Sequence, residues 1–168
     1  MNRFLLFVLL ISNGIFAQTP DRSQLESLTE KHWQSSLQLL NEIVSMPNDA
    51  VFPEQIEVNI QWCEAQFGKR DWTIERLETG GIPLLLVEKK NPKARKTALF
   101  YFHVDGQAVD RSKWQQPDPY TPVLKEQAAD GTWTIIPMER LQREYNPDWR
   151  IFARSSSDDK GPLAMFMT

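Results

Sequence analysis

Cysteine is nearly absent from this sequence, since Cys63 is the only one among 168 residues. A single thiol cannot form an internal disulfide, and it also excludes a structural zinc site built from several cysteines. Cys63 falls on the apolar face of a predicted helix, so we expect it to be a buried packing residue.

The sequence also lacks a strong excess of either charge. It carries 19 Lys and Arg against 22 Asp and Glu, with a net charge of −3 and both signs interspersed. A nucleic-acid-binding domain would show a basic stripe, so this composition argues against a nucleic-acid partner. Hydrophobic residues make up 41% and charged residues 24%, which is typical of a folded globular chain of about one domain.

No hydrophobic run is long enough to span a bilayer comfortably, which takes about 20 residues. The N-terminal run from Phe4 to Phe16 follows the basic Arg3 and precedes the small residue Ala17. This pattern predicts a signal peptide over residues 1–17, with cleavage near Ala17. We therefore expect residues 18–168 to be secreted or periplasmic, without a stable membrane anchor. A short hydrophobic helix that stays attached is the alternative.

Helical spacing of apolar residues predicts a first helix from about Asp21 to Met46, where Gln24 completes a capping-box pattern with Asp21. A second helix is predicted from Pro53 to Gly68. Its buried stripe should consist of Ile56, Ile60, Cys63 and Phe67.

Strands are predicted at Trp72–Leu77 and within residues 82–90, with a turn at the intervening glycines. Residues 98–102 are apolar throughout, which is typical of a central strand buried on both faces. With a further helix starting near Gly161, this predicts an α/β fold in which helices cover a mostly parallel or mixed sheet.

Residues 114–150 differ in character and contain five of the eleven prolines. We expect an irregular excursion there, with a short strand at 133–136 and a short helix near 138–143. The chain stops at Thr168, within the first turns of the last predicted helix. This suggests that residues 18–168 are the N-terminal part of a longer α/β protein.

Two groups of polar residues could carry chemistry. His103 and Asp105 follow the apolar run and, being two apart on a strand, should point to the same side. A metal-ligating histidine usually donates its other N–H to a carboxylate, although a polar turn with His103 satisfied by backbone is the alternative. Asp158 precedes another acid, Asp159, and such a pair is favoured by a nearby cation. An acid capping the next helix, with a solvated Lys160, is the alternative there.

Together, "FHVDGQAVDRSKWQQPDPYTPVL" and "WRIFARSSSDDKGPLAMF" resemble the dinuclear zinc exopeptidase and deacylase family. That family contains carboxypeptidase G, carnosinase-type dipeptidases, acetylornithine deacetylase and aminoacylases. Its pattern is a strand ending in H-x-D, then a tryptophan before a proline–aromatic pair, then G-R-G-x-x-D-D/N-K-G opening a helix. The matching positions here are Trp114, Pro119, Tyr120 and residues 153–161. The family's two glycines around the arginine are Ala153 and Ser155 in this chain.

The resemblance implies a role for each matched residue. His103 would ligate one metal, and Asp158 would bridge two metals. Asp105 would belong to the catalytic machinery by orienting His103. The peptide bond after Asp158 would be cis. The complete site would hold two zinc ions, with manganese or cobalt as alternatives, and would need a glutamate pair, another acid and a distal histidine from beyond Thr168.

The expected function is metal-dependent hydrolysis of peptide bonds by a secreted exopeptidase of the dipeptidase or carboxypeptidase type, present here as an incomplete N-terminal fragment. The fragment alone should bind metal weakly and catalyse nothing. An N-acyl amino acid deacylase of the same family, an inactive secreted binding protein with the same fold, and an unrelated secreted α/β domain are the alternatives. The substrate would be a small peptide or an N-acyl amino acid, and a homodimer is an option for the full-length protein.

Overall fold

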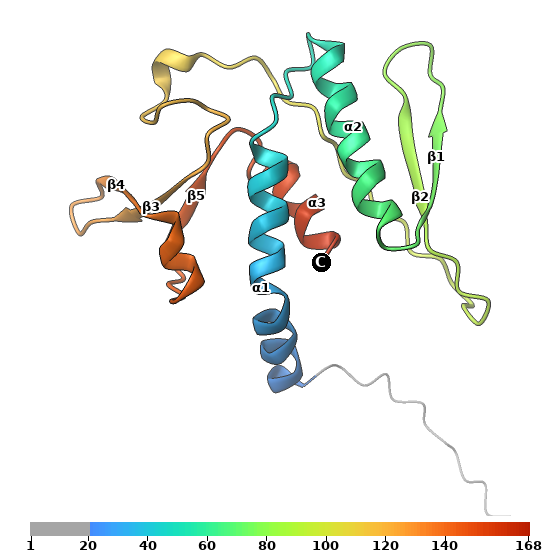
Figure 1. Ribbon diagram of the computed structural model, residues 1–168, viewed down its shortest axis with the longest axis horizontal. Helices are drawn as coiled ribbons and strands as arrows, with labels where there is room; N and C mark the ends of the chain where they lie inside the picture. The colour runs from blue at the N-terminus through green and yellow to red at the C-terminus, as the bar shows by residue number, and fades with distance from the viewer. Residues whose placement is uncertain (1–20) are drawn as a thin grey trace, which may run out of the picture. The chain divides into compact units, whose positions relative to one another are not determined.

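The computed structural model describes residues 21–168, so the predicted signal peptide over residues 1–17 lies outside the described residues. The chain divides into two compact units, Met1–Lys31 and His32–Thr168. The described part of the first unit is the exposed beginning of helix α1 (Figure 1). There the backbone N–H of Asp21 donates to the side chain of Gln24, which is one half of the predicted capping box.

The helices largely follow the sequence prediction. Helix α1 spans Arg22–Val44, α2 spans Pro53–Gly68 and α3 spans Lys160–Phe166. Pro53 occupies the first turn of α2, where its missing N–H costs no helical hydrogen bond. The predicted stripe of α2 is buried, because each of its four side chains is 5% exposed or less: Ile56, Ile60, Cys63 and Phe67.

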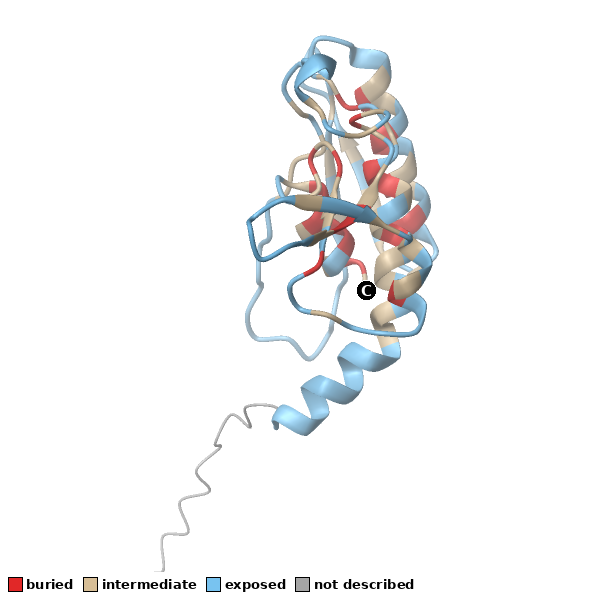
Figure 2. Ribbon diagram, turned by 90° about the vertical axis from the view of Figure 1, so that its left-hand side faces the viewer, coloured by how far each residue is buried: buried red, intermediate tan, exposed pale blue. Residues whose placement is uncertain are grey.

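The second unit contains two apolar clusters. The larger one joins α1, α2 and α3 through residues that include Ile43, Phe67 and Leu163. The smaller one consists of Leu124, Leu141 and Trp149 and has Trp33 and Leu37 of α1 at its edge. Figure 2 shows buried residues gathered along the helices of this unit. Helix α1 therefore contributes side chains to both clusters.

The strands form two small antiparallel sheets. One is the hairpin of β1 with β2, whose turn includes Gly80 at a φ of 81°. The other has three strands in the order β4-β3-β5, and it occupies much of the segment predicted to be irregular. The bounds are Thr73–Leu77 for β1, Leu84–Glu88 for β2, Val123–Gln127 for β3, Trp133–Ile136 for β4 and Arg150–Phe152 for β5, with 3-10 helices η1 at Arg111–Lys113 and η2 at Met138–Gln142. The described chain is thus a small mixed α/β structure.

The prediction of a mostly parallel or mixed sheet with residues 98–102 as its buried central strand is wrong for the described chain, whose two sheets are antiparallel. The only parallel pairing within residues 21–168 is the isolated bridge between Asp49 and Gly106. Residues 98–102 form no strand, and Leu99 is 87% exposed. A strand needs a neighbouring strand for its backbone hydrogen bonds, and an apolar sequence does not provide one. No strand of the described chain pairs with residues 98–102.

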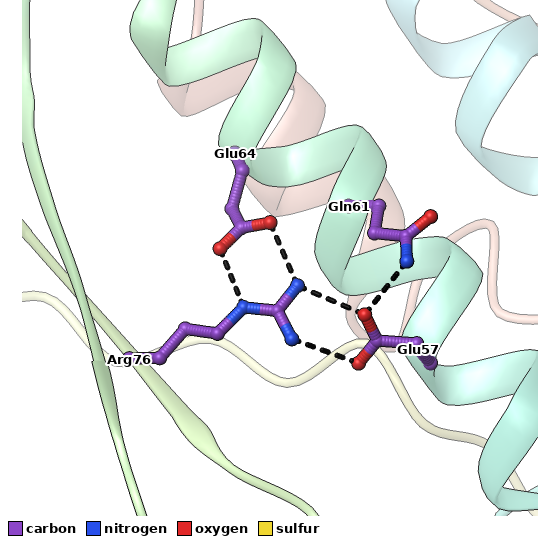
Figure 3. Close-up of polar contacts among 4 residues, drawn as sticks. All are labelled: Glu57, Gln61, Glu64 and Arg76. Atoms are coloured by element: carbon purple, nitrogen blue, oxygen red, sulfur yellow. Dashed lines mark hydrogen bonds and ion pairs between the residues drawn. The ribbon is translucent and has the colours of Figure 1, made fainter.

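The hairpin is fastened to α2 by one arginine between two glutamates (Figure 3). The guanidinium of Arg76 on β1 donates to both oxygens of Glu64 at 2.6 and 2.7 Å, and to both oxygens of Glu57 at 2.9 and 3.0 Å. Glu57 and Glu64 are two helical turns apart and so share one face of α2. The fixed fork of an arginine suits such paired bidentate contacts, which set the orientation of the hairpin.

Candidate metal-binding site

The three residues predicted for the site lie together. The Nε2 atom of His103 is 2.9 Å from Oδ1 of Asp158, a residue 55 positions later. On the other side of the ring, Nδ1 is 3.2 Å from Oδ1 of Asp105 and 3.2 Å from the backbone oxygen of Asp105. The imidazole therefore lies between two carboxylates, with one ring nitrogen facing each.

Two loops carry these side chains. His103 and Asp105 follow the apolar run 98–102, and the parallel bridge at Gly106 fixes the end of that segment. Asp158 lies in the loop between β5 and α3, and its peptide bond to Asp159 is cis, as the family resemblance implied. Neither carrier segment is a helix or strand, so tertiary contacts rather than a ladder set the spacing of the site.

The loop before Asp158 contains a residue in the left-handed region. Ser155 has a φ of 60°, a conformation that glycine adopts most readily. The pattern that the chain resembles has a glycine at this position, and Ser155 here adopts a glycine-like backbone conformation. Ala153, at the position of the other glycine of that pattern, is not among the described residues with positive φ and is buried.

The site is open to solvent. The side chains of His103, Asp105 and Asp158 are 35%, 51% and 86% exposed. Partial burial alone would lower the pKa of His103. The hydrogen bond to Asp158, the contact with the backbone of Asp105 and the two negative charges outweigh burial, so the pKa of His103 is raised above its ordinary value.

The chemical types of the donor atoms at this site suit zinc. Imidazole nitrogen and carboxylate oxygen both bind zinc at about 2.0–2.2 Å, and two such ligands in a tetrahedral arrangement lie about 3.3 Å apart. The 2.9 Å contact would therefore open by about 0.4 Å to admit an ion, a shift that exposed loops can make. Within residues 21–168, however, no three His, Cys, Asp or Glu residues are grouped to hold a metal. Two described side chains that could contact one ion lie together here, those of His103 and Asp158.

Lys160 was expected to shape the loop and not to bind metal, and the alternative of a solvated lysine is wrong. Its side chain is 0% exposed, and its amine donates to the backbone oxygens of Ile43 at 2.9 Å and Met46 at 2.7 Å. Burial lowers the pKa of Lys160 to about 7. Both the charged and the neutral amine keep the two N–H groups that these contacts need.

Asn48 is a second residue that sequence reasoning missed. It is 0% exposed, and its amide nitrogen donates to the backbone oxygen of Val104 at 2.7 Å and to Oγ of Ser155 at 3.0 Å. Nothing in the local sequence "MPND" distinguishes this asparagine from a turn residue. Its role depends on partners 56 and 107 positions away.

No protein-family model matches the chain, and no curated protein matches it. Among the helices of residues 21–168, none has the length and apolar character needed to cross a membrane.

Proposed function

We propose that this chain is the first part of the catalytic α/β domain of a secreted, dinuclear zinc-dependent exopeptidase. In this proposal His103 and Asp158 are metal ligands, and Asp105 orients His103. The observation that carries the proposal is the contact between Nε2 of His103 and Asp158, with Asp105 at Nδ1 of the same ring.

Each of the three side chains has a different role in this proposal. A neutral imidazole carries one N–H, and Asp105 favours the tautomer with that proton on Nδ1 because its carboxylate accepts it. The lone pair of Nε2 would then be available to an ion held together with Asp158, in place of the hydrogen bond that joins the two side chains when no ion is bound. The carboxylate of Asp158 is exposed and has two oxygens, so it can contact two ions at once. The contact with Asp105 also restrains the rotation of the ring.

A divalent ion bound here would supply Lewis-acid chemistry and a water of lowered pKa for attack on an amide carbonyl. A catalytic zinc site needs at least three protein ligands, and the described residues provide two. We infer that the remaining ligands and the general base come from sequence beyond Thr168. The substrate would be a small peptide, with an N-acyl amino acid as the alternative of the same chemistry.

Zinc affinity tests the ligand assignment directly. Isothermal titration of the chain with zinc should give weak binding, and Asp158→Asn or His103→Ala should each reduce the affinity about tenfold or more. Asp148→Asn removes an exposed carboxylate from another loop and should change nothing. Equal affinities for the native chain and the Asp158→Asn variant would contradict the assignment.

Hydrolysis by the full-length polypeptide tests the reaction class. Zinc-loaded protein is assayed with a set of dipeptides and a set of N-acyl amino acids, with Asp158→Ala as the control. Faster turnover of dipeptides supports the peptidase, and faster turnover of N-acyl amino acids supports the deacylase. Binding of either set without turnover would instead indicate an inactive binding protein and contradict the enzymatic proposal.

A further inference from the structure

We propose that Asn48 is a positioning residue for the metal site, and that it sets the distance between His103 and Asp158. The inference rests on the proposed function, because it assigns a role toward the same metal. Asn48 follows α1 and contacts no ligand itself. It acts through the two segments that carry the ligands.

Asn48 is hydrogen-bonded to both of these segments. Its amide nitrogen donates to the oxygen of Val104, the residue between His103 and Asp105, at 2.7 Å. The same nitrogen donates to Oγ of Ser155, three residues before Asp158, at 3.0 Å. One buried amide group therefore joins the histidine segment to the aspartate loop.

The backbone of Asn48 strengthens the same link. Its oxygen accepts from the N–H of Gly106 at 2.6 Å, and the N–H of Ala50 donates to the oxygen of Gly106 at 2.9 Å. These two bonds form the parallel bridge of Asp49 with Gly106. Side chain and backbone of residue 48 together thus hold residues 104 and 106, which flank Asp105.

The packing at this junction leaves little freedom. A Cβ atom added at Gly106 would lie 2.9 Å from Oγ of Ser155, 3.1 Å from the amide nitrogen of Asn48 and 3.2 Å from Nε of Arg154. The two ligand segments therefore approach each other through a glycine, at a point where Asn48 is completely buried. Replacing Asn48 should therefore change the distance between His103 and Asp158, because solvent does not reach Asn48 to take the place of the lost contacts.

The consequence for metal binding follows from the geometry of the ligands. His103 and Asp158 lie on loops, and their nitrogen–oxygen separation of 2.9 Å is close to that needed to share an ion. Residues that orient metal ligands typically change metal affinity about 10–100-fold when mutated. We therefore expect substitution of Asn48 to lower zinc affinity by such a factor, although both ligand side chains are still present.

Asn59 provides a matched control. It is also 0% exposed, its amide nitrogen donates to two backbone oxygens, those of Pro47 at 2.8 Å and Gln55 at 2.7 Å, and its Oδ1 has no partner, as is true of Asn48. Asn59 holds the residue before Asn48 but contacts neither ligand segment. Replacing it removes the same chemical group from the same region of the core.

The test compares zinc affinity and unfolding free energy for the native chain, Asn48→Ala, Asn48→Leu and Asn59→Ala. The leucine variant keeps the approximate size of the side chain and removes its hydrogen-bonding groups without adding charge, so it separates hydrogen bonding from cavity formation. We expect both alanine variants to be destabilised, while only the two Asn48 variants lose zinc affinity by about tenfold or more. Ser155→Ala removes one of the two side-chain links and should cause a smaller loss.

Three outcomes would count against the inference. Folded Asn48 variants that bind zinc as tightly as Asn59→Ala would overturn it and leave the proposed function intact. If both Asn48 variants fail to fold, unchanged zinc affinity in Ser155→Ala would overturn it. A native chain that does not bind zinc would overturn the proposed function and this inference together.

Discussion

The amine of Lys160 lies 2.9 Å from the backbone oxygen of Ile43, so the first residue of α3 provides a hydrogen bond to the last turn of α1. The final carbonyls of a helix have no partner within the helix, and a donor at that end also interacts favourably with the helix dipole. A second bond to Met46 extends the link beyond the end of α1. Because Lys160 is two residues after Asp158, this contact also fixes the end of the loop that carries the carboxylate.

Lys160→Met should destabilise the protein by about 1–3 kcal/mol. Methionine fills a similar volume but leaves the buried oxygen of Ile43 and the partly buried oxygen of Met46 without this donor. Urea unfolding at pH 7 measures the change. Lys96→Met, on an exposed loop, should stay within about 0.5 kcal/mol of the native chain. Equal stabilities for the two variants would show that the amine does not act as a helix cap.

Gly161→Ala should destabilise the protein by about 1–3 kcal/mol or more, because a Cβ at this position would lie 2.1 Å from the backbone oxygen of Ser156. Gly81→Ala is the matched control, since a Cβ there meets nothing within 4 Å. Thermal unfolding of both variants checks the prediction. A normal melting temperature for Gly161→Ala would mean that the loop between β5 and α3 does not follow the path described here.

The contacts of Arg76 predict a component of acid unfolding. Hydrogen bonds from Arg76 lower the pKa of both Glu57 and Glu64 below the ordinary value of 4.5. A carboxyl group with a lowered folded-state pKa adds stability above its unfolded pKa and loses it as the pH falls through the folded value. Stability should therefore fall below pH 4.5, and less steeply in a Glu57→Gln, Glu64→Gln double variant.

Urea unfolding free energies at pH 7 and pH 3 measure this difference. Glu75→Gln, on the outer side of β1, should retain the native pH dependence. A double variant whose stability falls with pH as steeply as that of the native chain would show that the Arg76 contacts contribute nothing to acid unfolding.

The segment 97–102 predicts self-association of the chain. No backbone–backbone hydrogen bond in the described part of the chain involves residues 97–102, and all six are uncharged. Leu99 and Tyr101 are 87% and 80% exposed. Unpaired apolar segments of this length readily pair with other strands. Leu99→Lys should reduce association in sedimentation experiments, whereas Val51→Lys, at another exposed apolar position outside this segment, should not.

Local signals were sufficient for the helices. The periodicity of α2 predicted its bounds and its buried stripe, because a helix forms its own hydrogen bonds and needs only one apolar face. The hairpin of β1 and β2 was predicted for the same reason, since its partner strand is a few residues away. The third helix was correctly placed by the glycine and proline that open it.

Contacts between residues far apart in the sequence could not be predicted from local sequence patterns. The run 98–102 has the composition of a buried strand, but burial needs partners that its own residues do not encode. Strands β3 and β5 were missed because β5 has only three residues and β3 alternates poorly. The motif resemblance correctly predicted that His103 and Asp158 lie together. The roles of Asn48 and Lys160 were not predicted, because they depend on contacts across more than 50 positions.

A double-mutant cycle on zinc affinity tests the central claim most directly, which is that His103 and Asp158 hold the same ion. The affinities of the native chain, His103→Ala, Asp158→Asn and the double variant are measured by isothermal titration. If one ion is shared, either single change removes most of the affinity and the double change adds little. Losses that simply add, or a single variant with native affinity, would show that the two residues do not form one metal site.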